Sequence, residues 1–209
     1  MKKYLLGLGV FVFAFAILFV SIFESSSVSY SYAPFKPLST SANNNCETSM
    51  INYTFQYAGG ILPDNPLWGL KALRDKIWYV LTLSPLKKAE LALLFSDKRL
   101  IYAQTLFEEG KPDIAMSTLT KGEKYLEVAV NDETLAGTQG YDTRAFLNKL
   151  ATASLKHREM IENMLPLIPE NGRPLAIKTE NYAKNSYKAA RDGLNSKGLP
   201  VPINPFDGD

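Results

Sequence analysis

The chain has 209 residues, of which 46% are hydrophobic and 21% are charged, and it contains one Cys and one His. This composition excludes a collagen, a fully disordered chain and a multi-span membrane protein. Lys2 and Lys3 are two of the 23 basic residues, so the rest of the chain carries 21 basic and 21 acidic residues and has no net charge that would attract nucleic acid. A single Cys also excludes an intrachain disulfide and a Cys-based metal site.

The amino-terminal part of the chain is predicted to cross a membrane. Tyr4–Phe23 is a run of about 20 residues without a charge, and Lys2 and Lys3 precede it. A helix of that length spans a hydrocarbon core of ~30 Å, and lysines at one end favour a cytoplasmic amino terminus. We therefore predict a single-pass anchor over residues 1–24. The lipid bilayer is then a partner through Tyr4–Phe23, and the bulk of the chain lies outside the cytoplasm.

The alternative is a cleaved signal peptide, which would make the protein secreted. The apolar core of a signal peptide has about 7–15 residues, which is shorter than this run. Small residues at cleavage-like spacing place the alternative cleavage near Ser29–Ser31, whereas Pro34 opposes cleavage after Ala33. No Cys directly follows the apolar run, so a lipoprotein anchor is not expected. Both interpretations export the rest of the chain.

Residues 25–60 are rich in Ser and Asn, which predicts a flexible tether. One stretch of it has a strand period, because four apolar residues alternate with polar ones: Ile51, Tyr53, Phe55 and Tyr57. The favoured interpretation is an extended segment that lays its apolar side on the domain, and the alternative is strand addition to the sheet edge of a partner. Cys46 also lies in the tether, where an idle thiol is favoured over a disulfide between chains.

Five amphipathic helices are predicted after Gly59-Gly60. Helix starts such as Ser84-Pro85 and stops such as Gly110 bound the apolar periods. These signals place the helices at about 64–81, 84–110, 111–130, 142–165 and 174–194. The loop between the third and fourth helices is expected at Asn131–Gly140. The apolar stripe of the first helix, which is expected to face the core, is Leu67, Leu70, Leu73, Ile77 and Leu81.

The predicted fold is an all-α, antiparallel bundle of about five helices on a flexible stalk behind an N-terminal membrane helix. The bundle occupies residues 61–195, and an extended tail follows at residues 196–209. A chain of ~135 residues is long enough to bury one core, and short connections make neighbouring helices antiparallel. Trp68 and Leu100 are predicted to be core residues.

A pattern of helix starts, stops and charged residues occupies the region from Leu62 to about Val130. Its members are Leu62-Pro63-Asp64-Asn65-Pro66-Leu67-Trp68, Lys71, Leu83-Ser84-Pro85, Lys88-Ala89-Glu90-Leu91, Asp97-Lys98-Arg99-Leu100, Gly110-Lys111 and Ala115. In these residues the chain resembles an uncharacterised family of exported helical domains from bacteria and archaea, classed as a domain of unknown function. The resemblance implies a helical domain behind an N-terminal membrane segment. It supplies no established catalytic or binding residue.

Two motifs in this region have both a functional and a structural interpretation. Arg99 lies in mid-helix beside the apolar stripe, so an ion pair with a carboxylate such as Asp75 or Glu123 is favoured over a ligand contact. Ser84 and Lys87 have the Ser-x-x-Lys spacing of acylating serine enzymes. The other elements of those enzymes, Ser-Asp-Asn and Lys-Thr-Gly, are missing from the sequence, so a helix cap followed by a solvated lysine is favoured.

The remaining candidates also favour structural roles. His157 lies alone on an apolar helix face, where a satisfied core or boundary histidine is favoured over a ligand or base. Glu159 and Glu162 share a helix face, but no Glu-x-x-His motif accompanies them, so a di-metal bundle site is not expected. A basic stripe consists of Lys184, Lys188 and Arg191. A solvated helix face is favoured for it over a binding site for anionic lipid or wall polymer. No catalytic, cofactor-binding or metal-binding residue is predicted, and no cofactor is expected.

The predicted function is that of a non-catalytic, membrane-tethered helical domain outside the cytoplasm that acts by interaction with a protein or another component of the envelope. The alternative is an unrecognised envelope enzyme or a periplasmic-type chaperone. A deep pocket with converging titratable groups would favour the alternative. The sequence leaves the specific role, the partner and the oligomeric state open.

Overall fold

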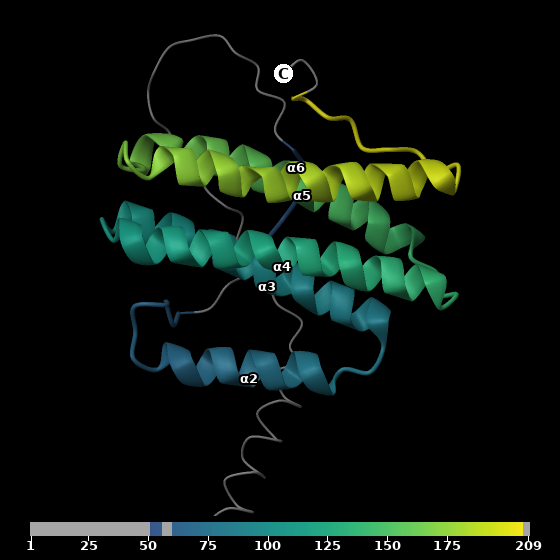
Figure 1. The fold of residues 1–209 in the computed structure, drawn as a ribbon, viewed down its shortest axis with the longest axis horizontal. Helices are drawn as coiled ribbons and strands as arrows, with labels where there is room; N and C mark the ends of the chain where they lie inside the picture. The colour runs from purple at the N-terminus through teal and green to yellow at the C-terminus, as the bar shows by residue number, and fades with distance from the viewer. Residues whose placement is uncertain (1–50, 56–59, 207–209) are drawn as a thin grey trace, which may run out of the picture. The chain divides into compact units, whose positions relative to one another are not determined.

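Five α-helices make up the part of the chain that the structure describes (Figure 1). The computed structural model describes residues 51–55 and 60–206, and these contain no strand. The all-α prediction is confirmed for them, whereas the predicted anchor Tyr4–Phe23 lies outside them. Among the helices described, none is both long and apolar enough to cross a membrane. In chain order they are α2 (Trp68–Leu81), α3 (Pro85–Glu108), α4 (Pro112–Thr138), α5 (Arg144–Met164) and α6 (Arg173–Ser196), with a 3₁₀ turn, η1 (Leu165–Leu167), after α5.

Helices α3 and α4 form a tight hairpin. Pro85 occupies the first position of α3, as predicted. Gly110 follows the helix with φ at +72°, a left-handed conformation that favours glycine. The two helices approach closely at Gly122, where an added Cβ would lie only 3.0 Å from Arg99 Cβ. A glycine at this position therefore allows the backbones of α3 and α4 to pack together.

Helices α5 and α6 form a second pair, which lies above the α3–α4 hairpin in Figure 1. Pro166 and Pro169 end α5 through the turn η1, and Pro174 lies in the first turn of α6. Helix α6 also packs on α4, and α5 contacts α3. The observed bounds of both helices agree with the predicted 142–165 and 174–194 to within two residues.

Two apolar clusters fill the space between these four helices. One is built around Leu93, Leu126 and Leu150, and the other around Leu100 and Ile161. Leu100 has no exposed surface, which confirms it as a core residue. Burying a side chain of this size contributes about 1.5–3 kcal/mol to stability.

The predicted apolar stripe of α2 faces away from the bundle. The five stripe residues have exposed fractions of 38–67%: Leu67, Leu70, Leu73, Ile77 and Leu81. The opposite face contacts the bundle through aromatic rings, with Trp68 5.3 Å from Tyr102 and Trp78 6.2 Å from Phe95 between ring centroids. Asp75 is the one residue of α2 that is fully buried. The expectation that the stripe faces the core is wrong, because the aromatic and charged side chains of α2 have partners on the neighbouring helix.

Trp68 is only partly buried, so its assignment to the core is also wrong. It is the first residue of α2 and lies at the margin of the bundle. One contact of its ring is with Tyr102, and the ammonium of Lys71 lies 5.4 Å from the ring centroid. Beyond these contacts, Trp68 helps to line an open pocket that is described below.

Two predicted helix boundaries differ from the structure. Helix α2 begins one turn later than predicted, because Asn65 organises a turn: its side-chain oxygen accepts a hydrogen bond from the Leu67 amide at 2.9 Å. Helix α4 continues through the predicted loop Asn131–Gly140 as far as Thr138. Its apolar face extends to the buried Ala136, which explains why the helix does not end at Asn131.

The extended segments at both ends of the described region pack on the bundle. Ile51, Tyr53 and Phe55 are partly buried, whereas Asn52 and Thr54 are exposed. This alternation confirms the favoured interpretation of an extended segment laid on the domain, and Tyr57 lies outside the described residues.

The tail after α6 packs on α5 and α6. The Tyr187 hydroxyl donates a hydrogen bond to the Pro202 carbonyl at 3.0 Å, and the Arg158 guanidinium lies 4.2 Å from the centroid of the Phe206 ring. Leu199 and Val201 pack on the core. The tail is therefore part of the packed structure as far as Phe206.

Candidate functional site

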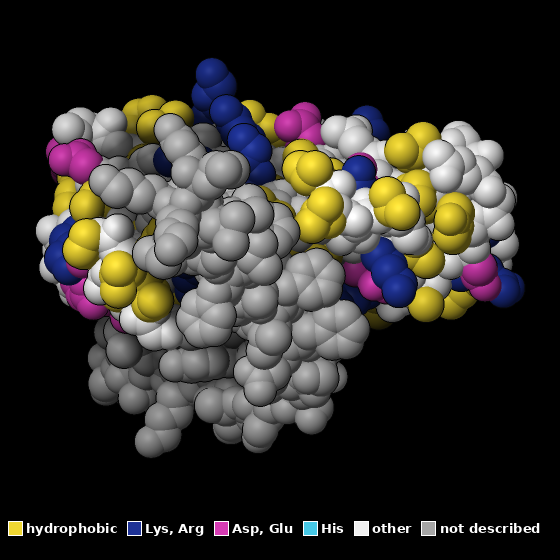
Figure 2. Space-filling view, turned by 90° about the horizontal axis from the view of Figure 1, so that it is seen from below, with side chains coloured by type: hydrophobic (Ala, Val, Ile, Leu, Met, Phe, Trp, Pro, Cys, Tyr) yellow, Lys and Arg dark blue, Asp and Glu magenta, His cyan; other side chains and the backbone are white. Residues whose placement is uncertain are grey.

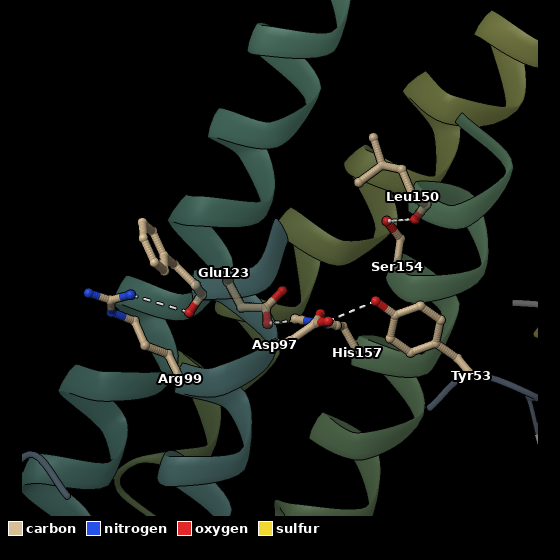
Figure 3. A network of polar contacts seen from close by, with 8 residues as sticks. Tyr53, Asp97, Arg99, Glu123, Leu150, Ser154 and His157 are labelled. Carbon is tan, nitrogen blue, oxygen red and sulfur yellow. Dashed lines mark hydrogen bonds and ion pairs between the residues drawn. The ribbon is translucent and has the colours of Figure 1, made fainter. Parts of the chain in front are cut away.

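A histidine between two carboxylates lies at the centre of the bundle (Figure 3). His157 of α5 contacts Asp97 of α3 through Nε2, at 3.0 Å, and Glu123 of α4 through Nδ1, at 2.7 Å. The three side chains are almost completely buried. This set, which we name the His157 network, joins three helices through charged hydrogen bonds. The prediction of a satisfied core histidine is confirmed.

The extended segment at residues 51–55 closes the His157 network. The Tyr53 hydroxyl donates a hydrogen bond to the second oxygen of Asp97 at 2.7 Å (Figure 3). The ring of Phe55 packs on His157 with 5.7 Å between centroids, and the Ile51 amide donates a hydrogen bond to Glu159 at 3.4 Å. The network is therefore shielded from solvent by a part of the chain that precedes the bundle.

Both carboxylates stabilise the protonated form of His157. Burial alone would lower the pKa of this imidazole, but the charge of Glu123 and the hydrogen bonds to Asp97 and Glu123 raise it to about 9. At neutral pH both ring nitrogens therefore donate hydrogen bonds, and His157 is an imidazolium. With neither nitrogen free to accept a proton or bind a metal, the network is suited to holding helices together.

The carboxylates of Glu159 and Glu162, which share a helix face, form ion pairs with basic side chains. Lys156 contacts Glu159 at 3.0 Å, and Arg158 contacts Glu162 at 2.9 Å and Glu180 of α6 at 3.1 Å. Across the described residues, no group of three or more His, Cys, Asp or Glu side chains is arranged to hold a metal ion. The ion pairs of Glu159 and Glu162 lie within α5, and the pair of Arg158 with Glu180 connects α5 to α6.

An open pocket of about 410 Å³ lies where the start of α2 meets α3 and α4. The pocket has both apolar and charged walls, which are Pro63, Trp68, Ala72, Arg99, Asp113, Ile114, Ser117, Thr118 and Lys121. A mixed lining of this kind and size is typical of small-molecule sites. This pocket is a candidate ligand site among the described residues.

Arg99, in the wall of this pocket, does not make the predicted ion pair. Asp75 pairs with Arg74 at 2.8 Å, and Glu123 belongs to the His157 network. The Arg99 guanidinium instead lies 4.3 Å from the centroid of the Tyr125 ring and donates to the Phe95 carbonyl at 3.2 Å. Burial lowers the pKa of Arg99, and its interactions with Tyr125 and Asp75 oppose that effect only in part.

The third candidate surface is the exposed apolar side of α2. We define the outer face of α2 as its exposed apolar residues, which are Leu67, Leu70, Leu73, Ile77, Val80 and Leu81. With about 3.6 residues per turn, the five that lie within α2 project away from Asp75, and Leu67 directly precedes the helix. Seen from below, the part of the surface that is not grey carries apolar side chains in several groups, with both basic and acidic side chains among them (Figure 2). Several exposed large apolar side chains on one helix make this side a candidate interaction site.

The other predicted candidates have ordinary structural roles. Ser84 occupies the N-cap position of α3 in an extended conformation, although its side chain makes no capping hydrogen bond, and Lys87 is exposed as predicted. In the basic stripe, Lys184 pairs with Glu180 at 3.0 Å and Arg191 with Asp192 at 2.9 Å. Cys46 lies outside the described residues.

Asp97 and Glu123 are the partners of His157 that sequence reasoning did not identify. Each interrupts an apolar period: Asp97 lies between Leu93 and Leu100, and Glu123 between Leu119 and Leu126. A charged residue at a core position of a helix must have a buried partner. Charged or ionisable residues at core positions on three helices were therefore the signal that could have predicted this network.

Together, the helices and the His157 network define an all-helical domain whose buried charges join its helices. The chain belongs to the family described as a domain of unknown function, DUF5667, which matches residues 60–171. The family match covers 112 of 209 residues, includes Asp97, Glu123 and His157, and leaves Tyr53 and α6 outside. It confirms the resemblance to an uncharacterised domain family. No curated protein and no solved structure matches the chain.

Proposed function

We propose that this chain is a non-catalytic, membrane-tethered domain that lies outside the cytoplasm and acts by interaction within the cell envelope. The observation that supports an interaction is the outer face of α2, where five apolar residues of one helix and Leu67 just before it are exposed. The inner face of the same helix is occupied by its contacts with α3, so the exposed face has no role in holding α2 to the bundle. Apolar surface of this extent favours a partner.

The tether is proposed from the sequence. Tyr4–Phe23 is long enough to span a bilayer, and Lys2 and Lys3 favour its cytoplasmic end. The mature chain should then begin at residue 1 or 2 and remain with membranes after extraction with carbonate. Protease added to spheroplasts should cut at Lys36 and release the downstream domain. Recovery of a soluble mature chain beginning between Val28 and Tyr32 would show instead that the protein is secreted.

The interaction is tested by photo-crosslinking in the cells that produce the protein. A photo-reactive phenylalanine replaces Leu73, which is 54% exposed on the outer face of α2, and in a matched control it replaces Lys149, which is exposed on α5. We expect crosslinked products, to protein or to lipid, from position 73 and few from position 149. Equal and low crosslinking at both positions would contradict the proposal.

The open pocket favours a second candidate function, an envelope enzyme that the sequence does not reveal. Arg99, Asp113 and Lys121 bring titratable groups to its wall, and Ser117 and Thr118 bring hydroxyl groups. Among the described residues, no hydrogen bond or ion pair joins Asp113, Ser117 and Lys121 into a preformed catalytic group. Hydrolysis of an ester, phosphoester or peptide by the wild type, with loss of turnover in Lys121→Gln, would establish this candidate.

A further inference from the structure

The surface around α2 is apolar and basic at the same time. The outer face of α2 continues into Leu83, which is 93% exposed in the turn before α3. Between Leu67 and Lys88 the chain carries one acidic residue, Asp75, and five basic residues, Lys71, Arg74, Lys76, Lys87 and Lys88. Five positive charges minus one negative charge give this segment a net charge of +4.

The rest of the chain after Lys3 has the opposite charge. Its totals are 21 basic and 21 acidic residues, so outside residues 67–88 there remain 16 basic and 20 acidic residues, and with the protonated His157 the net charge is −3. Asp75 is also buried and paired with Arg74, so it adds no free carboxylate to the basic segment. Lys71 lies against the rings of Trp68 and Tyr102 on the bundle side, whereas Lys76 and Lys87 are exposed. These exposed cations would favour an anionic surface on the α2 side of the domain.

We infer that the outer face of α2 rests on the outer leaflet of an anionic lipid bilayer, with its leucine side chains inserted at the level of the headgroups. This inference deepens the proposed function by naming the partner, and it rests on the proposed anchor. An amphipathic helix at a membrane surface combines an apolar face with flanking basic residues, and its binding depends on anionic lipid. Both properties occur together in residues 67–88.

The proposed anchor makes even a weak contact effective. Residues 24–50, which number 27, separate the apolar run from Ile51, where the chain is fixed to the bundle. A flexible chain of 27 residues spans roughly 26–31 Å as a root mean square. Tethering over such a distance gives an effective concentration in the millimolar range, so α2 needs little intrinsic affinity to occupy the bilayer surface.

The test uses the full chain reconstituted into vesicles that contain either phosphatidylcholine alone or phosphatidylcholine with phosphatidylglycerol. Cys46→Ser removes the native thiol, and a single Cys introduced as Leu73→Cys carries an environment-sensitive fluorophore. The matched control carries the same label at Lys149→Cys on α5. Quenching is measured with a nitroxide attached to the lipid and with iodide in the water. Flotation of the vesicles after carbonate treatment tests the anchor independently.

In the anionic vesicles we expect the lipid nitroxide to quench the label at position 73 several-fold more than the label at position 149. Iodide should quench the label at position 149 more than the label at position 73. Lys76→Glu with Lys87→Glu should reduce the quenching at position 73 without releasing the chain from the vesicles.

Equal lipid quenching at the two positions would overturn the inference and leave the anchor intact. Protection from iodide without lipid quenching would also overturn it, because a protein segment would then cover α2. Loss of the chain from floated vesicles would refute the proposed anchor itself.

Discussion

Raising the pH should remove the stability that the protonated His157 gives to the bundle. The pKa of His157 is raised from 6.5 to about 9 in the folded protein because Glu123 and Asp97 together outweigh the effect of burial. The folded pKa lies above the unfolded one, so the contribution is fully present below about pH 6.5 and is lost as the pH rises through about 9. The perturbation is therefore a change from about pH 6 to about pH 9.5.

The size of the effect follows from the two pKa values. The difference between 6.5 and about 9 corresponds to about 3 kcal/mol, at about 1.4 kcal/mol for each pH unit. Typical domains have a free energy of unfolding of about 5–15 kcal/mol, so the loss is a large part of the total. His157→Gln preserves a hydrogen-bonding side chain of similar size but cannot ionise. It should unfold more easily at pH 6, because it leaves two buried carboxylates without a cation.

The assay is urea unfolding, followed by circular dichroism, of a fragment comprising residues 50–209 at a series of pH values. Lys71, whose pKa burial lowers to about 8, contributes with the opposite sign. It is present in both proteins, so its effect cancels in the difference between the wild type and His157→Gln. The difference in free energy of unfolding between the two proteins should decrease by about 3 kcal/mol as the pH rises from about 6 to about 9.5. If the free energies of unfolding of the two proteins keep a constant difference at all pH values, the assignment of a charged imidazole to the folded state is refuted.

Five further substitutions test packing. Tyr53→Phe leaves a buried oxygen of Asp97 without its donor and should cost about 1–3 kcal/mol in urea unfolding, whereas Thr54→Ala on the exposed side should cost less than about 0.5. Leu100→Ala should cost about 2–5 kcal/mol, and a cost below about 0.5 would place Leu100 at the surface. Gly122→Ala should lower the thermal midpoint because its Cβ meets Arg99, and Gly69→Ala, with open space around it, should leave the midpoint equal or higher.

The sequence predicted most helices because their boundaries depend on local chemistry. Pro85, Gly110 and Pro166 mark starts and stops through their own backbone restrictions, which tertiary contacts did not change. The end of α4 was missed for the opposite reason. Asn131–Gly140 contains two glycines and polar residues, yet burial of Ala136 against the bundle keeps this stretch helical as far as Thr138.

The orientation of α2 was not predictable from periodicity. Leu70, Leu73 and Ile77 have the spacing of a core stripe, and periodicity alone assigns such a stripe to the interior. The partners that hold the other face, such as Tyr102 for Trp68, lie on a different helix and come together only in the fold. The same holds for the His157 network, whose two carboxylates lie 34 and 60 positions before the histidine in the chain.

The closure of the His157 network by residues 51–55 determines where a mechanical load would enter the domain. Tyr53 is hydrogen-bonded to α3 through Asp97, and Ile51 to α5 through Glu159. Tension on the chain that precedes Ile51 would therefore be carried by the middle of the bundle. Detaching residues 51–55 would strip a hydrogen bond from Asp97 and uncover the ring of His157. Pulling on this end of the chain would thus begin to unfold the domain at its charged centre.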